Sequence, residues 1–136
     1  MKPNHVVLSL PVRSTSKSFH FYHDGLGLAA EKIGDDIVTL ELPGLSLFLV
    51  SQQQFEKSSK IAAAFPSENT SGCLLSCSIS TKAEVDNTLK KVAEAEGTAY
   101  PSTTRILFGR KQYVAYFKDP DGHPWELVWN MDEATP

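Results

Sequence analysis

Apolar and polar side chains alternate along several short stretches of the chain, and each stretch predicts a strand with one buried face. Asn4 to Val12 has Val6, Leu8 and Leu10 at every second position, the period that puts side chains on one face of a sheet. Similar runs follow, separated by turn residues such as Gly34-Asp35 and Pro43-Gly44. They predict strands near residues 28–33, 36–42, 45–51, 74–80, 98–101, 112–117 and 123–129.

Two other stretches have the spacing of amphipathic helices. The first begins at Ser14-Thr15-Ser16, which offer N-caps, and stops at Gly25 and Gly27. The second opens with the capping-box sequence Thr81-Lys82-Ala83-Glu84 and ends before Gly97. Their apolar residues recur at helical intervals: Phe19, Tyr22 and Leu26 in the first helix, and Val85, Leu89 and Val92 in the second.

The order of these elements is βαβββ, written twice, which predicts an α+β fold and a single domain over residues 1–136. Module one covers about 4–51, a connector covers 52–72, and module two covers about 73–130. Two interpretations of the connector stay open. It is either a surface connection, or an arm or short helix that packs on a partner subunit.

The composition indicates which kinds of binding partner and which cellular compartment to expect. Thirteen basic and sixteen acidic residues give a net charge of −3, with no long basic run, so nucleic acid and anionic membrane are not expected partners. The chain has two cysteines, Cys73 and Cys77. On an extended strand they lie roughly 13 Å apart, beyond disulfide reach. We therefore expect reduced, mostly buried thiols and a cytoplasmic protein.

The segment Tyr113 to Asn130 is the most informative part of the sequence. Asp119-Pro120-Asp121-Gly122 predicts the turn of a β-hairpin, and Glu126 alternates with Trp125, Leu127 and Trp129 on its second strand. Glu126 therefore points to the opposite face from these large apolar side chains. The hairpin, together with Ser18-Phe19-His20-Phe21-Tyr22 in the first helix, resembles the vicinal oxygen chelate superfamily of glyoxalases, bleomycin-resistance proteins and extradiol dioxygenases.

The resemblance implies a cupped, barrel-like mixed sheet with helices outside, and a homodimer. It also implies a divalent metal site in the family's metalloenzymes, to which each module gives one ligand from its first strand and one from its last. Glu126 occupies the last-strand position of module two. When Pro43-Gly44 is aligned with Asp121-Gly122, the counterpart of Glu126 in module one is Phe48.

Counting back from the helix signatures puts Val7 and Leu74 at the two first-strand positions. Val7, Phe48 and Leu74 offer no lone pair, and one carboxylate does not hold a divalent ion at useful affinity. We therefore expect a degenerate metal site and no metal cofactor. This gap-free register is not the only one, because slips along the strands bring other residues to these positions.

The alternative is a divalent-metal-dependent lyase of the glyoxalase type, or an extradiol dioxygenase, using His5 and Glu126 with Glu41 or Cys73. It requires slips in three strands, and a one-residue slip in module two would turn Ser76 and Ser78 toward the core. His20 and His23, one helical turn apart, are interpreted as polar surface residues rather than metal ligands.

Without an ion, the cupped sheet would form a mostly apolar pocket for a small ligand. Glu126 is then the candidate acid or base, and we expect it to be isolated from cations with a raised pKa. Arg105, Arg110 and Lys111 fall in a predicted loop that either rims the pocket or lies in solvent. The residues expected to line the pocket are Val7, Ser9, Phe48, Leu74, Ser76, Ser78, Tyr116 and Glu126.

Overall fold

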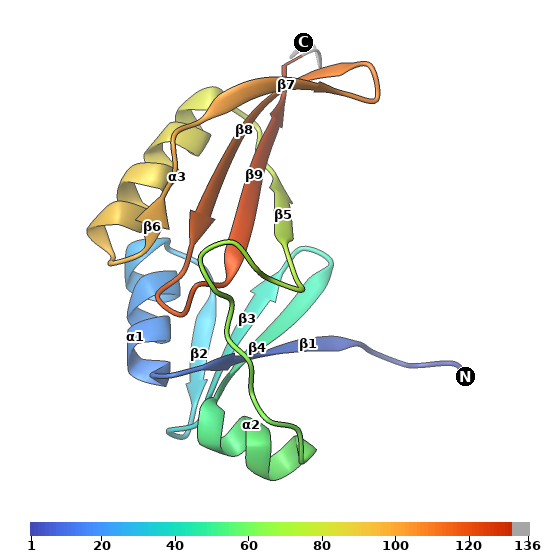
Figure 1. The fold of residues 1–136 in the computed structure, drawn as a ribbon, viewed down its shortest axis with the longest axis vertical. Helices are drawn as coiled ribbons and strands as arrows, with labels where there is room; N and C mark the ends of the chain where they lie inside the picture. Colours follow the sequence, from blue (N-terminus) through green and yellow to red (C-terminus); the bar gives the residue numbers. More distant parts are fainter. Residues whose placement is uncertain (132–136) are drawn as a thin grey trace. The chain divides into compact units, whose positions relative to one another are not determined.

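Two hydrogen-bonded sheets organise the chain, one in each half of the sequence (Figure 1). The structure is a computed structural model that describes residues 1–131. These residues fall into one unit of residues 1–65 and a second that begins at Pro66. The boundary lies inside the predicted connector. That the two units form one domain over residues 1–136 stays a prediction.

Module one contains a four-stranded sheet in the order β1-β4-β3-β2, with β1 and β4 parallel and the other pairs antiparallel. Helix α1 packs against β2, β3 and β4. The buried apolar side chains of this unit include Phe21, Tyr22, Val38, Leu40, Leu47 and Leu49. The elements are β1 (Val7–Val12), α1 (Thr15–Phe19), η1 (His20–Gly25), β2 (Ala30–Ile33), β3 (Ile37–Leu42), β4 (Leu45–Ser51) and α2 (Gln52–Ser59).

The first predicted helix is present, but its second half has π geometry. Ser14 is the N-cap, and its hydroxyl oxygen accepts a hydrogen bond from the backbone N–H of Lys17 at 3.2 Å. From His20 the helix continues as η1, and Gly27 follows it with φ +70°. Glycine tolerates this left-handed conformation because it has no Cβ, so Gly27 ends the helix as expected.

The connector begins with a short helix, α2. Ser51 caps it by accepting from Gln54 N–H, and Lys60 ends it with φ 62°. Helix α2 packs against β1 and β4 of its own unit. The helix foreseen in one of the two interpretations therefore exists, and whether it also contacts a partner subunit stays a prediction.

Module two repeats the arrangement, with sheet order β5-β9-β8-β6 and β7 also paired to β8. The capping residue Thr81 accepts from Glu84 N–H at 3.1 Å, as the capping-box sequence predicts. At the other end of α3, Glu96 rather than the adjacent Gly97 adopts the left-handed conformation, with φ 70°. The elements are β5 (Leu75–Ser78), α3 (Lys82–Glu94), β6 (Thr98–Ala99), β7 (Thr103–Leu107), β8 (Arg110–Lys118) and β9 (Pro124–Asn130).

The prediction that Arg105, Arg110 and Lys111 lie in a loop is wrong. Arg105 lies in β7, which pairs antiparallel with β8 and places Arg105 opposite Gln112. Arg110 and Lys111 begin β8 instead of lying in a loop. Strands β6 and β7 both pair with β8 and together take the place that β2 has in module one. The segment between them contains Pro101, whose missing N–H cannot continue a strand ladder.

The two faces of the module-two sheet differ in what they contact and in the side chains they carry. Helix α3 packs against β6, β8 and β9 (Figure 1, yellow helix). On its side of the sheet, Phe117 and Trp125 stack with their ring centroids 5.8 Å apart, and both are 2% exposed. Tyr113 donates from the same face to Asp86 of α3. The opposite face carries the polar side chains that alternate with these residues.

The α+β class with two βαβββ modules is confirmed. The predicted hairpin turn is also present: the Asp119 carboxylate accepts from the N–H groups of Asp121 and His123, both at 2.9 Å, and Gly122 has φ 90°. Cys73 and Cys77 are free but only half-buried, and burial raises the pKa of Cys77. No helix within residues 1–131 is long and apolar enough to cross a membrane.

Candidate ligand-binding site

Glu126 stands in a row of side chains that crosses three strands of module two. It lies in the middle of β9, opposite Ser76 on the parallel neighbour β5 and opposite Tyr116 on the antiparallel neighbour β8. Paired residues project to the same face of a sheet. The row is therefore a direct result of strand register, and it lies on the face opposite α3.

Both carboxylate oxygens of Glu126 accept hydrogen bonds within this unit. Oε1 accepts from the Ser76 hydroxyl at 2.8 Å. Oε2 accepts from the Tyr116 hydroxyl at 2.5 Å and from Nη1 of Arg105 at 3.0 Å. Glu126 is 7% exposed, so these donors replace the water that a carboxylate would otherwise bind.

Arg105 is fixed by the same network. Its Nε donates to Oε1 of Gln112 at 2.9 Å, and its Nη1 donates to the Tyr116 hydroxyl at 3.1 Å as well as to Glu126. Gln112 in turn donates to the side-chain oxygen of Asn130 at 2.8 Å. The guanidinium is planar, so contacts at two of its nitrogens set its orientation.

The expectation that Glu126 is isolated from cations with a raised pKa is wrong. Burial by itself raises the pKa of this carboxyl group, but the hydrogen bonds from Tyr116 and Ser76 and the charge of Arg105 outweigh it. The pKa of Glu126 is therefore lowered from its ordinary value. The hydrogen bond to Glu126, with burial and the nearby negative charge, raises the pKa of Tyr116. Near neutral pH, Glu126 is thus a carboxylate and Tyr116 a neutral donor.

These residues do not fit a divalent metal ion. A cation at Glu126 would compete with the donors that bind its two oxygens and would lie close to the positive guanidinium of Arg105. Leu74, the first-strand position of module two, precedes β5, is 49% exposed and has no donor atom. Val7 begins β1, and Phe48 lies in β4 paired with Ser9.

The residues of the alternative metal site are exposed, half-buried or hydrogen-bonded to other side chains. His5 is exposed and precedes β1, and Cys73 is half-buried and precedes β5. Glu41 accepts from the Ser46 hydroxyl at 2.9 Å. Within residues 1–131, no three or more His, Cys, Asp and Glu side chains are grouped so as to hold a metal ion. His20 and His23 are exposed, and each contacts Asp24 through Nδ1.

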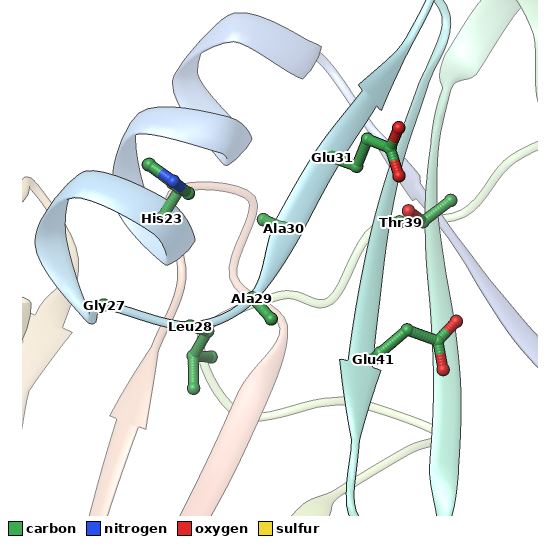
Figure 2. Close-up of a pocket in the computed structure, with 8 residues that line it drawn as sticks. All are labelled: His23, Gly27, Leu28, Ala29, Ala30, Glu31, Thr39 and Glu41. Atoms are coloured by element: carbon green, nitrogen blue, oxygen red, sulfur yellow. The ribbon is translucent and has the colours of Figure 1, made fainter.

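Module one has a pocket of about 460 Å³ beside β2 and β3 that the sequence did not indicate. Figure 2 shows Glu31, Thr39 and Glu41 pointing to one side of these strands, while His23 lies on the helix. Glu31 is paired with Thr39, so the two share a face. The rest of the lining is small or apolar: Gly27, Leu28, Ala29 and Ala30.

The family follows from comparison of the whole sequence. The sequence model of the Glyoxalase/Bleomycin resistance protein/Dioxygenase superfamily matches residues 2–127. The chain belongs to this superfamily. The match spans both βαβββ modules, so the resemblance inferred from the hairpin and the first helix is confirmed. No curated protein sequence matches this superfamily member closely enough to compare.

Solved structures support the same fold. A hypothetical protein from S. aureus is 24% identical with a TM-score of 0.78, covering 95% of each chain. A glyoxalase-related enzyme from Fulvimarina pelagi is 22% identical with a TM-score of 0.76, covering 94% of this chain and 89% of the other. A lactoylglutathione lyase from Agrobacterium tumefaciens is 18% identical with a TM-score of 0.63, covering 94% of this chain and 95% of the other. At these identities the likeness concerns the fold.

Arg105 and Gln112 are the members of the polar network that sequence reasoning did not place in the site. A signal was available, because Gly109 follows the run from Thr103 to Leu107 and directly precedes the strand that begins at Arg110. A glycine between two such runs is typical of a hairpin turn. That hairpin would have put Arg105 opposite β8.

Proposed function

We propose that this superfamily member binds a small, largely apolar ligand on the Glu126 face of the module-two sheet, without a resident metal ion. The observation that carries the proposal is the set of three hydrogen-bond donors, one of them a cation, that surrounds Glu126. Its two oxygens accept from Ser76, Tyr116 and Arg105, and a carboxylate held in this way is a fixed polar anchor rather than an open metal ligand.

Apolar surface adjoins this anchor. Val128 lies two residues from Glu126 on β9, projects to the same face and is half-buried, whereas its partner Val114 is only 1% exposed. Exposed Leu74 precedes Ser76 by two residues, the spacing that keeps side chains on one face of a strand. An apolar body with one polar group would contact both kinds of surface. Val7, Ser9 and Phe48 of module one remain lining residues expected from the sequence analysis alone, and the proposal for the module-two sheet does not depend on them.

Binding or sequestration is favoured over glyoxalase-type or dioxygenase chemistry. Those reactions need an ion to polarise the substrate, and the donor set around Glu126 does not suit one. As a carboxylate of lowered pKa, Glu126 is also a weaker base than one tuned to work near neutral pH. The lyase from Agrobacterium tumefaciens shares the fold, and its activity is not carried over to this chain.

Two measurements test the proposal. Metal analysis of protein purified without chelator should find substoichiometric Ni, Zn, Fe and Mn in both the native protein and Glu126→Ala. A thermal-shift screen with hydrophobic drugs, aromatic acids and thiol conjugates should find ligands whose effect persists in excess chelator. Near-stoichiometric metal that is lost in Glu126→Ala would instead support the metal-dependent lyase or dioxygenase with His5 and Glu41 or Cys73.

The proposal includes a cytoplasmic homodimer, as the family resemblance and the two free cysteines suggest. Light scattering after size-exclusion chromatography should give twice the mass of the chain. A variant without residues 52–59, the helix α2, tests whether the connector takes part in that dimer. A monomer at micromolar concentration would remove the homodimer from the proposal without affecting ligand binding.

A further inference from the structure

We propose that Arg105 recognises the ligand, and that the ligand is an apolar molecule bearing a carboxylate. The inference rests on the proposed function and names the class of molecule for the same site. In it, Glu126 does not contact the ligand. Its role is to position Arg105, whose guanidinium presents the free donor of the network.

The hydrogen-bond inventory of the network leads to this assignment. Tyr116 donates to Glu126 and accepts from Arg105, and Ser76 donates to Glu126. On Arg105, Nε and Nη1 are used. Its second terminal nitrogen, Nη2, makes no hydrogen bond to any residue between 1 and 131. The group left for a ligand is therefore an N–H donor.

This donor is accessible. Every buried side-chain nitrogen and oxygen in the described part of the chain has a partner, so a nitrogen without one is in contact with solvent. The Arg105 side chain is 30% exposed, against 9% for that of Glu126. A ligand that approaches this face of the sheet thus meets the guanidinium before the carboxylate.

The chemistry of Nη2 selects an oxygen acceptor. Guanidinium–carboxylate hydrogen bonds are roughly twice as strong as neutral ones, and a fixed guanidinium loses little conformational entropy on forming them. A ligand ammonium would face like charge on Arg105 and would compete with the three donors that already bind Glu126. The predicted ranking for one apolar body is therefore carboxylate, then neutral amide, then amine.

Three probes with the same apolar body test the ranking on the unaltered protein: naphthoate, naphthamide and naphthylmethylamine. Titration calorimetry should show naphthoate binding about tenfold or more tightly than the amine, the scale of a charge-assisted hydrogen bond. Equal affinities, tighter binding of the amine, or absence of naphthoate binding overturns the inference. Equal binding of all three without metal would leave the proposed function intact.

Variants then assign the preference to Arg105. Arg105→Met should remove the advantage of naphthoate over naphthamide, whereas Lys111→Met should keep it. Lys111 is a matched control because it lies beside Gln112 on β8, has the same charge and projects to the opposite face. Equal loss in both variants would indicate a general charge effect and overturn the assignment.

Glu126→Gln separates a positioning role from direct contact. Glutamine keeps the shape and can still accept from Arg105, while the guanidinium loses its neutralising charge. Naphthoate affinity should therefore rise by a few-fold, and amine affinity should stay low. A fall in amine affinity with no gain for naphthoate would mean that Glu126 itself contacts the ligand, against the inference.

Discussion

The same row of three paired positions occurs in both modules, with an apolar residue at its centre in one and an acid in the other. In module one the row is Ser9, Phe48 and Thr39, and in module two it is Ser76, Glu126 and Tyr116. The strand order and pairing directions are the same. The outer positions carry hydroxyl groups in both modules, so the middle residue makes the difference: an aromatic ring in one unit and a charged network in the other.

The two rows differ in what the middle residue, Phe48 or Glu126, requires from its neighbours. Phe48 needs no hydrogen-bond partner, whereas a carboxylate at the equivalent position must be given donors if it is to be buried. Module two supplies them from three strands, including Arg105 on β7. At the edge of module one, Glu31 rather than a cation is paired with Thr39. The comparison teaches that an acid at the buried centre of the row needs donors and a cation from neighbouring strands, whereas an aromatic ring does not.

The largest expected effect comes from giving the centre of the module-two row an apolar side chain, as in module one. Glu126→Leu leaves Arg105 without its carboxylate, and we expect a loss of about 2–3 kcal/mol in the free energy of unfolding, less than for a fully buried pair because Arg105 is partly exposed. Urea denaturation measures it. The matched change Phe48→Leu in module one should cost under about 1.5 kcal/mol. Equal losses would remove the distinction between the two rows.

The second prediction concerns how the stability of the fold depends on pH in the acid range. Because the pKa of Glu126 is lowered on folding from the ordinary value of 4.5, its contribution to stability is present above that value and is lost as the pH falls through the lowered pKa. The stability difference between the native protein and Glu126→Gln should therefore shrink below about pH 4.5. Asp24 and Asp86 also have lowered pKa values, and they cancel in this difference. A difference that is constant with pH would contradict the prediction.

A smaller effect is expected from the third member of the row. Tyr116→Phe removes one donor to Glu126 and one acceptor for Arg105, and we expect a loss of about 1 kcal/mol. In module one, Thr39→Val removes a hydroxyl from the equivalent position and should change stability by less than about 0.5 kcal/mol. Chemical denaturation of the two variants side by side checks whether the network is confined to module two.

The helix ends of the two modules give the smallest prediction. The first helix is followed by Gly27 in the left-handed region, whereas α3 is followed by Glu96 at almost the same φ. Glu96→Gly should therefore stabilise the protein by about 0.5 kcal/mol, and Gly27→Ala should destabilise it by about 1 kcal/mol. Thermal denaturation measures the melting temperature of each variant. A shift of both melting temperatures in the same direction would refute the prediction.

Much of this comparison could be predicted from the sequence, because it depends on local patterns. Alternation located every strand except β7, and alignment of Pro43-Gly44 with Asp121-Gly122 made Phe48 the counterpart of Glu126. The observed registers agree with that alignment, since Ser9 is opposite Phe48 and Ser76 is opposite Glu126. The pattern of residues 75–78 also placed Ser76 on the face away from the core.

The partner of Glu126 could not be predicted in the same way. Thr103 to Leu107 has no regular alternation, because Arg105 lies between Thr104 and Ile106 and both neighbours are exposed. The strand is defined by pairing with β8 through a turn in which Phe108 takes φ 51°, a conformation that its residue type does not indicate. The ion pair then joins residues 21 apart in sequence. The error in the pKa of Glu126 followed from this missed strand.

The parallel pairing of β5 with β9 also has a consequence for how the network forms during folding. Tyr116 and Glu126 are 10 residues apart, whereas Ser76 and Glu126 are 50 apart. Contacts between nearby residues form faster, because the chain entropy lost in closing a short loop is smaller. We therefore expect β7, β8 and β9 to bring Arg105, Tyr116 and Glu126 together before β5 adds Ser76. Pulse-labelling hydrogen exchange should show the amides of β8 and β9 protected ahead of those of β5, so that the recognition surface is largely assembled while the edge of the sheet is still open.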